Sequence, residues 1–412
     1  MRGSIVIIGT LDTKGEEIAY LKQLIGRRGH DTIVLDCGVF GKPIFPPEVT
    51  REEVAEASGV ALNHVVALKS EKKAMDTMAR GAAAIVGKLY LNKKLDGILA
   101  IGGSMGTGLG LSVMNVLPTG VPKLMLSTVA FAPFLMQGMA SSGFMRTDIT
   151  MMQSTVDFWG LNSIVKRVLE QAAGAITGMV EMKVEGPPKP LIGLTTLGGV
   201  ACNYVSWIKP LVEAKGYELI IFHTSGMGAI YLEAFVKQEA LVGVLDLSPH
   251  EMMEELYGEL GLKGGGEEMK TMGGKNIPRV VSPGCLNWFA WAGPEERLPS
   301  HLKNRKMVFH TEFAISIKAS KEEMSEVGRT MACKLNKAVG PTTVIIPTEG
   351  FDERDKPGGV YYDPEADRAL TEALKKHIKP EIKVMELDVH LNDQTFAEAA
   401  VATLFRMIEK TA

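Results

Sequence analysis

The chain is 412 residues long, more than one hydrophobic core usually supports, so we expect two domains. With 46% hydrophobic and 23% charged residues the composition is that of an ordinary globular protein, and the net charge of −3 excludes the basic surface that holds nucleic acid. The four cysteines lie far apart without a C-x-x-C pair, which excludes a disulfide framework and a zinc ribbon and indicates the reducing cytoplasm.

The chain opens directly on a strand pattern, without the n-region, h-region and cleavage site of a signal peptide. No charged residue lies between Lys123 and Arg146, yet the serines, glycines, Pro133 and Gln137 there are too polar for a membrane-spanning helix. We therefore expect no membrane segment, and we interpret this stretch as a buried strand followed by a packed loop.

Apolar runs of strand length alternate with helical patterns along the chain, which is typical of βαβ units on a parallel sheet. The predicted strands are 4–8, 32–35, 97–101 and 123–126 in the first half, and 191–194, 218–222, 242–245, 279–281, 343–346 and 383–387 in the second. The predicted fold class is therefore α/β with doubly wound parallel sheets.

The two halves share one plan. "IGTLDTKGEEIAYLKQLIGRRGHDTIVLDCG" (8–38) and "IGLTTLGGVACNYVSWIKPLVEAKGYELIIFHTSG" (192–226) each contain a strand with Ile-Gly, a Thr-bearing loop, a helix, a glycine stop and a second strand. Between the halves, "VEGPPKP" (184–190) holds three prolines and a glycine, which exclude a regular element. We predict two Rossmann-like subdomains of similar topology, residues 1–186 and 187–412.

Ligands of doubly wound sheets bind at the carboxyl ends of the strands. In this chain those ends carry Gly9–Thr10, Asp36, Gly102–Ser104, Ser127–Thr128, Thr195–Thr196, His223, Asp246–Ser248, Ser282–Gly284, Thr348–Glu349 and Asp388–His390. Loops at that edge are polar in any case, so the pattern locates a site without naming its chemistry.

The first candidate motif is the turn in "VIIGTLDTKGEE" (6–17). Thr13 and Glu16 fit a T-x-x-E capping box, which explains them without a ligand. The box does not explain Thr10, Asp12 and Lys14 in the same turn, where helix amides and an ammonium group would attract an anion. The two glutamates at 16–17 repel phosphate, and the turn is not a Walker loop, so a cap and a phosphate site both stay open.

The second candidate motif is "AIGGSMGTGLG" (100–110), which follows a predicted strand. Its glycines at 102, 103, 106 and 108 permit close approach of the backbone to a ligand, and Ser104 and Thr107 add hydroxyl groups. Four glycines in seven residues exceed what a turn requires, so the pattern favours a phosphate-binding loop over a bare turn.

The same residues also fit G-x-S-x-G, the nucleophile elbow of serine hydrolases, with Ser104 as the nucleophile. An HGGG-type oxyanion segment is not evident, and the glycines around Thr107 predict a poor helix start. A hydrolase is therefore the minor alternative; its triad would draw on Asp246, His250, Asp388 and His390.

Three residues of the second half are candidates for catalysis. Glu349 follows a strongly apolar strand and precedes Gly350, which makes it the best carboxylate candidate. His223 and His390 follow predicted strands, and each is either an acid–base group or a hydrogen-bonded structural histidine. The histidines show no close metal-ligand spacing, so zinc has little support.

In these motifs the chain resembles a family of uncharacterised bacterial and fungal proteins related to the N-terminal, ATP-binding domain of a plant protein that blocks tobamovirus RNA replication. The resemblance rests on motifs in the family's order over nearly the whole chain: "IGTLDTK" (8–14), "AIGGSMGTGL" (100–109), "VPKLMLSTVA" (121–130), "GLN" (160–162), "FHTSGMG" (222–228), "VLDLSPHE" (244–251), "YYDPEAD" (361–367) and "LDVHLND" (387–393).

The resemblance implies two Rossmann-like subdomains, nucleotide binding and a tendency to form homodimers. The ATP-binding residues that it implies are Gly9, Thr10, Asp12, Thr13, Lys14, Gly102, Gly103, Ser104, Gly106 and Thr107. The family loop often has a further glycine where this chain has Met105, which narrows the approach for a phosphate.

These inferences combine into one hypothesis. We expect Thr13 to cap the first helix while Thr10, Asp12 and Lys14 face the 102–107 loop across the phosphates of ATP, with Mg²⁺ on Asp12. The second subdomain would close over an unknown small molecule at a site that holds the candidate catalytic residues His223, Glu349 and His390. An ATP-dependent enzyme, a nucleotide-binding regulatory module and a serine hydrolase all stay open.

Overall fold

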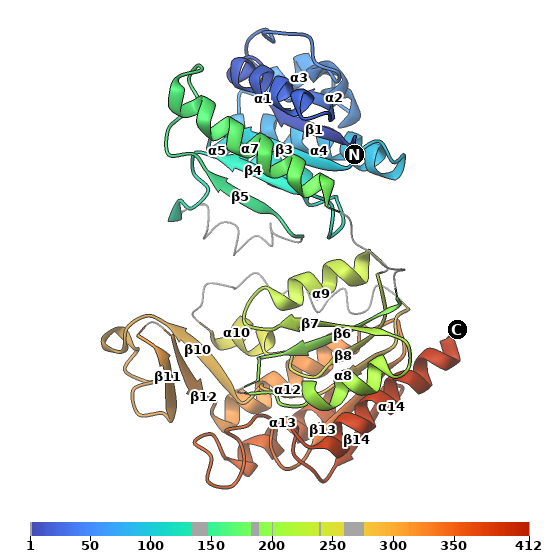
Figure 1. The fold of residues 1–412 in the computed structure, drawn as a ribbon. Helices are drawn as coiled ribbons and strands as arrows, with labels where there is room; N and C mark the ends of the chain where they lie inside the picture. The colour runs from blue at the N-terminus through green and yellow to red at the C-terminus, as the bar shows by residue number, and fades with distance from the viewer. Residues whose placement is uncertain are drawn as a thin grey trace. The chain divides into compact units, whose positions relative to one another are not determined.

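The computed structural model describes residues 2–133, 147–182, 189–199, 201–238, 240–258, 276–312 and 314–411. The chain divides into two compact units, Met1–Gly186 and Pro187–Ala412 (Figure 1). The loop predicted after the strand at Lys123 lies largely outside the described residues, as does most of the proline-rich segment 184–190. Among the helices that the structure describes, none has the length and apolar character needed to cross a membrane.

The first unit is a parallel sheet of five strands in the order β2-β1-β3-β4-β5. Its strands are β1 (Ser4–Gly9), β2 (Asp31–Asp36), β3 (Gly97–Gly102), β4 (Lys123–Ser127) and β5 (Thr150–Gln153). Its helices are α1 (Gly15–Arg27), α2 (Arg51–Ala57), α3 (Leu62–Ala67), α4 (Glu71–Leu91), α5 (Ser104–Met114) and α7 (Ser163–Glu181). The predicted α/β class is confirmed; the edge strand β5 was not predicted.

Helices cover both faces of this sheet because its strands alternate apolar side chains between the faces. Ile5 and Ile7 of β1 pack with α1 and α7, whereas Val6 and Ile8 pack with α2, α4 and α5. Figure 1 shows α1 and α7 side by side on one face. The strands therefore read as continuous apolar runs, which is why the sequence predicts them well.

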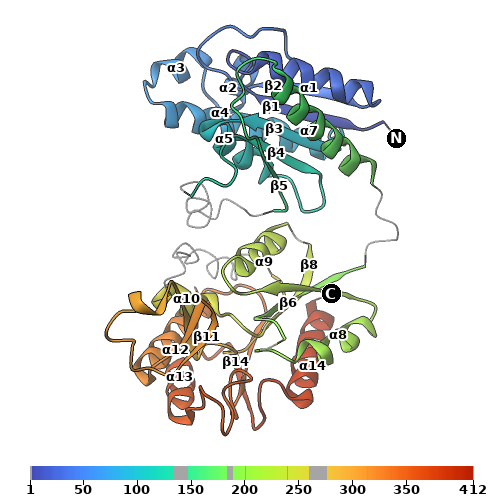
Figure 2. The same ribbon diagram turned by 60° about the vertical axis from the view of Figure 1, so that its left-hand side comes forward.

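The second unit has a parallel sheet of six strands in the order β14-β13-β9-β8-β6-β7. Its strands are β6 (Leu191–Thr196), β7 (Glu218–His223), β8 (Leu241–Asp246), β9 (Arg279–Val281), β13 (Thr342–Pro347) and β14 (Lys383–Leu387). Its helices are α8 (Val205–Glu213), α9 (Gly228–Lys237), α10 (Glu251–Tyr257), α12 (Lys321–Leu335), α13 (Pro364–His377) and α14 (Gln394–Thr411). Figure 2 shows α8 and α14 on one side of this sheet, with α12 and α13 on the other.

The second unit also carries an antiparallel sheet that was not predicted. Its order is β10-β12-β11, from β10 (Trp288–Ala292), β11 (Met307–Thr311) and β12 (Ala314–Lys318). β11 is largely exposed and interrupts its pairing between Phe309 and Thr311. A short, exposed strand of this kind leaves no apolar run in the sequence.

Both parallel sheets reverse their strand order at one point. In the first unit β2 and β3 lie on opposite sides of β1, and in the second β7 and β8 lie on opposite sides of β6. The connections on either side of such a switch point diverge, which opens a crevice at the carboxyl ends of the two central strands. The fold thus singles out the β1–β3 edge and the β6–β8 edge as places for a ligand.

Candidate functional site

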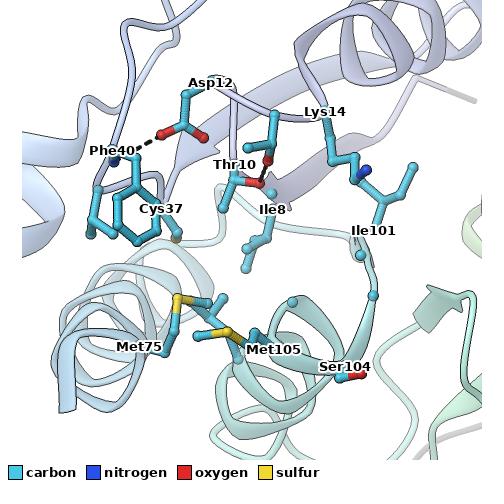
Figure 3. Close-up of a pocket in the computed structure, with 17 residues that line it drawn as sticks. Ile8, Thr10, Asp12, Lys14, Cys37, Phe40, Met75, Ile101, Ser104 and Met105 are labelled. Carbon is cyan, nitrogen blue, oxygen red and sulfur yellow. Dashed lines mark hydrogen bonds between the residues drawn. The ribbon is translucent and has the colours of Figure 1, made fainter. Parts of the chain in front are cut away.

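A cavity of about 340 Å³ lies at the β1–β3 switch point of the first unit (Figure 3). Three loops supply most of its wall, at residues 9–14, 37–40 and 101–106, and Met75 of α4 and Leu109 of α5 complete it. Of the ten residues that the resemblance implies for ATP, nine line this cavity: Gly9, Thr10, Asp12, Thr13, Lys14, Gly102, Gly103, Ser104 and Gly106.

The predicted capping box at Thr13 is wrong. Helix α1 begins at Gly15 with Lys14 in the N-cap position, and no side chain caps it. The Thr13 hydroxyl instead forms a hydrogen bond of 2.5 Å with the hydroxyl of Thr10, because the Lys14 amide donates to the Thr10 carbonyl and tightens the turn. The first amides of α1 are therefore left without an intrahelical acceptor or a cap.

Asp12 is engaged with the protein. One of its oxygens, Oδ2, accepts hydrogen bonds from the amides of Phe40 and Gly41 at 3.1 Å and lies 3.4 Å from Arg51. Arg51 also pairs with the fully buried Asp36 at 2.6 Å. Because the guanidinium already balances Asp12, this carboxylate holds the 38–41 loop in place and is a poor candidate for the Mg²⁺ ligand that we predicted.

Lys14 lines the cavity, but its ammonium is also engaged. It donates a hydrogen bond to the Phe158 carbonyl and lies 4.0 Å from Asp157. It also lies over the exposed ring of Trp159, 5.8 Å from the ring centroid. A phosphate would have to draw Lys14 away from these partners, so its part in anion binding is smaller than the sequence indicates.

The glycine-rich loop turns directly from β3 into α5. This helix begins at Ser104, which corrects the prediction of a poor helix start, and no side chain caps it. Its first turn contains no acidic residue. A Cβ atom at Gly102 would lie 2.7 Å from the Cα of Gly106, so glycine at 102 is required for the close turn.

The prediction for Thr107 is corrected by the structure. This side chain is fully buried and is not part of the cavity wall. Its hydroxyl donates to the carbonyl of Gly103 at 2.7 Å and lies 2.7 Å from the hydroxyl of Ser127. Thr107 therefore fixes the start of α5 against β4, since a threonine inside a helix can bond the carbonyl four residues back.

The remaining wall of the cavity is apolar, and the sequence analysis missed it. Phe40 is 78% exposed, and Met105 is 39% exposed. Figure 3 shows Phe40, Met75 and Met105 around the same side of the cavity, with Cys37 beside Phe40. Burial raises the pKa of the Cys37 thiol, so this cysteine is a neutral part of the wall. An exposed phenylalanine in a turn-rich segment, "GVFGKP", was the available signal.

The structure places Ser104 at the start of a helix, as the hydrolase alternative requires, but it places no histidine of the first unit in the same cavity wall. Ser104 follows β3 and opens α5, as a nucleophile elbow requires. The first unit contains only two histidines, His30 and His64. His30 precedes β2 and bonds Gly3 and Glu181, at the amino edge of the sheet, and His64 lies on α3. Neither histidine is part of the cavity wall that holds Ser104.

At the corresponding switch point of the second unit, buried side chains of neighbouring strands and loops hydrogen-bond to one another. Thr195 at the end of β6 donates to Asp246 at the end of β8 at 2.9 Å. The Ser248 hydroxyl lies 2.7 Å from the Tyr204 hydroxyl and 3.2 Å from the sulfur of Cys202. The sulfur of Cys285 lies 3.3 Å from that of Cys202, although the two are distant in sequence.

The three candidate catalytic residues of the second half do not share one site. Glu349 and His390 line a separate cavity at the ends of β13 and β14. His223 is not part of that wall; it ends β7, and its Nδ1 lies 2.8 Å from the hydroxyl of Ser225. Both ring nitrogens of His390 are engaged, because Nδ1 accepts from the Asn392 amide at 3.1 Å and Nε2 donates to the Asp352 carbonyl at 2.9 Å. His390 is therefore a structural histidine.

The side chains that usually hold a metal ion in proteins are those of His, Cys, Asp and Glu. Across the described ranges, no set of three or more His, Cys, Asp or Glu side chains is placed to hold a metal ion.

Known proteins resemble the chain over its whole length. Models of the Uncharacterised protein family (UPF0261) match residues 3–185 with the N-terminal domain and residues 189–408 with the C-terminal domain. A UPF0261 protein of Clostridium tetani is 36% identical over 100% of both chains, and one of Brucella suis is 34% identical over 98% of this chain and 95% of its own.

Two other known proteins are less similar to this chain. The ToMV susceptible protein tm-1(GCR26) of Solanum lycopersicum is 28% identical over 99% of this chain and 56% of its own length. The UDP-GlcNAc 2-epimerase of Methanocaldococcus jannaschii is 11% identical over 98% of this chain and 100% of its own, and its TM-score of 0.23 is too low to carry an argument. The matches along both halves show that the chain belongs to the uncharacterised protein family UPF0261.

Proposed function

We propose that the first unit binds a nucleotide, with ATP as the ligand to test, in the cavity at the β1–β3 switch point. The observation that carries the proposal is that α1 and α5 both begin at this cavity without a side-chain cap. The first amides of a helix have no intrahelical acceptor, and together with the helix dipole they favour an anion.

The phosphates belong at α5 rather than at α1. The first turn of α1 contains Glu16 and Glu17, whereas that of α5 contains no acidic residue. The amides of Ser104, Met105 and Gly106 are therefore the donors for a phosphate, and the small side chain of Ser104 leaves them accessible. Thr10 and Thr13 at the opposite wall add hydroxyl groups.

The base belongs against the apolar wall. Phe40, Met75 and Met105 offer a flat ring and two flexible thioethers, which suit a planar aromatic ligand. A cavity of about 340 Å³ lies within the range of small-molecule sites, which are mostly apolar with a few placed polar groups. A cavity with an anion-binding end and an apolar end matches a nucleotide better than a free phosphate.

The proposal is tested by calorimetric titration of the whole protein with ATP and Mg²⁺. Gly103→Val puts a branched side chain into the cavity wall, and its nearest neighbour, the Thr128 hydroxyl at 3.6 Å from an added Cβ, leaves room for folding. Gly108→Val is the matched control, since residue 108 lies on α5, the helix that Gly103 precedes, but is outside the wall and has open space around it.

We expect the wild type to bind ATP. Gly103→Val should weaken this binding by about tenfold or more, and Gly108→Val should leave it unchanged. No binding of ATP, ADP or GTP by the wild type would overturn the proposal. Ser104→Ala separates the hydrolase alternative, because it would abolish ester hydrolysis but retain ATP binding. A regulatory module would bind ATP without turnover, whereas an ATP-dependent enzyme would consume it once its second substrate is present.

A further inference from the structure

The second unit contains a larger cavity, of about 710 Å³, at the carboxyl ends of β13 and β14. We call it the acidic cavity, because Glu349, Glu353, Asp367 and Asp393 line it together with a single lysine, Lys356. The starts of α8 and α13 complete its wall. It lies beside β13 and β14 rather than at the β6–β8 switch point, so it needs an explanation of its own.

The amide and cationic donors of this cavity are engaged with the protein. Lys356 forms an ion pair with Glu353. The side-chain amides of Asn203 and Asn392 donate to the same carboxylate at 3.4 and 3.1 Å. Because His390 also has both nitrogens engaged, these groups have little left with which to hold an anionic ligand.

The free polar side chains of this wall are carboxyl groups. The carboxylate of Glu349 receives no hydrogen bond from any residue in the described part of the chain, and its side chain is exposed to the cavity. Asp367 is only 8% exposed, and its Oδ1 is buried without a donor among the described residues. Burial and the neighbouring Asp355 raise the pKa of Asp367 to about 9, so its carboxyl is neutral at pH 7. Among the described residues, the wall carboxylates without a cationic partner are therefore Glu349 and Asp393, and Asp393 already accepts the His390 amide at 3.0 Å.

Two aromatic side chains belong to the same wall. Trp207 of α8 is 42% exposed and Tyr362, just before α13, is 38% exposed. Aromatic faces next to carboxylates are the usual surroundings of a bound organic cation, because the ring quadrupole attracts positive charge. The cavity therefore combines engaged donors, a free carboxylate and exposed rings.

We propose that the acidic cavity binds a small organic amine, whose ammonium group donates to Glu349 while its carbon skeleton lies against Trp207 and Tyr362. The ligand must bring hydrogen-bond donors and positive charge, since the wall supplies acceptors and negative charge. This site is independent of the nucleotide cavity, which belongs wholly to the first unit.

The probes are spermidine, agmatine and glucosamine, with glucose as the uncharged counterpart of glucosamine. Each is titrated calorimetrically into the whole protein at low ionic strength, where charge attraction is least screened. Glu349→Gln removes the charge at nearly constant shape. Glu372→Gln is the matched control, because Glu372 is an exposed glutamate on α13 outside the cavity wall.

We expect saturable binding of at least one amine, about tenfold weaker in Glu349→Gln and unchanged in Glu372→Gln, because a charge-assisted hydrogen bond is lost. Trp207→Ala is a second variant at an exposed position, and it should weaken the same binding severalfold. The proposal is overturned if no amine saturates at millimolar concentration, if glucose binds as tightly as glucosamine, or if both glutamate variants behave alike. None of these outcomes depends on ATP.

Discussion

Replacing Arg51 with leucine tests whether one buried cation holds the walls of the nucleotide cavity in place. The Arg51 side chain is 6% exposed, and its partners Asp36 and Asp12 are 0% and 3% exposed. Its guanidinium also donates to the carbonyl of Gly41, so it joins β2, the turn before α1 and the 38–41 loop. Arg51→Leu leaves two buried carboxylates without their counter-charge.

The expected loss of stability is about 3 kcal/mol, at the lower end for breaking a buried ion pair by removing one partner. The lower end applies because Asp36 Oδ1 keeps hydrogen bonds from the amides of Leu11 and Gly38, at 3.0 and 2.9 Å. The matched control is Arg2→Leu. Arg2 pairs with Asp31 at 2.6 Å, but both side chains are more than half exposed, so we expect little change.

Hydrogen exchange read by mass spectrometry is the assay, because a single melting curve does not separate the two units. Peptides that cover β1, β2 and the 38–41 loop should exchange about a hundredfold faster in Arg51→Leu, while peptides of the second unit stay unchanged. Equal exchange in Arg51→Leu and Arg2→Leu would refute the reasoning, because it would show that the buried position of the pair adds nothing.

Three further predictions follow from single residues. Phe40→Ala should weaken ATP binding without lowering the melting temperature, because the ring is 78% exposed and packs little in the free protein; a lower melting temperature with unchanged binding would contradict this. Gly81→Ala should destabilise the first unit, because the added Cβ would lie 1.8 Å from the carbonyl oxygen of Val54. Gly87→Ala on the same helix is the control: it has open space around it, so it should be neutral or stabilising by up to about 1 kcal/mol. Denaturant titrations of both variants measure the difference. Asp367 should make the second unit less stable as pH rises from 5 to 9. Its pKa is raised to about 9 in the folded protein, so the folded state holds a proton that the unfolded carboxyl releases near pH 4. The free energy of unfolding should therefore fall by at most about 1.4 kcal/mol per pH unit. Asp367→Asn should flatten that dependence, and an unchanged slope of unfolding free energy against pH would contradict the assignment.

The parallel sheets could be predicted because their strands contain apolar runs that alternate with helical segments. Every residue of 5–8 and 98–101 is apolar, and Gly9–Thr10 and Gly102–Ser104 mark where these strands end. The antiparallel β10–β12 sheet escaped prediction although only its outer strand β11 is largely exposed, while β10 is apolar and β12 mostly buried. Antiparallel strands need no crossover helix between them, so this sheet lacks the alternation of strands and helices that predicted the parallel sheets.

The sequence predicted where the candidate site lies in the fold, but it did not predict which residues bond to the side chains of that site. The strand-end rule brought the loops of Thr10 and Gly103 to one cavity, since β1 and β3 are neighbours in the sheet. The partners of Asp12 and Lys14 were not predictable, because Arg51 and Phe158 lie far away in sequence. Those long-range contacts turn two apparent ligand residues into groups already engaged within the fold.

The most direct test of the account is hydrogen exchange of the whole protein with and without ATP and Mg²⁺. The account predicts slower exchange in the peptide that spans Gly103–Thr107, where the uncapped amides of α5 would bond the phosphates, and in the turn around Thr10. Unchanged exchange in both segments at saturating ATP, or slower exchange confined to the second unit, would contradict the claim that this cavity is the nucleotide site.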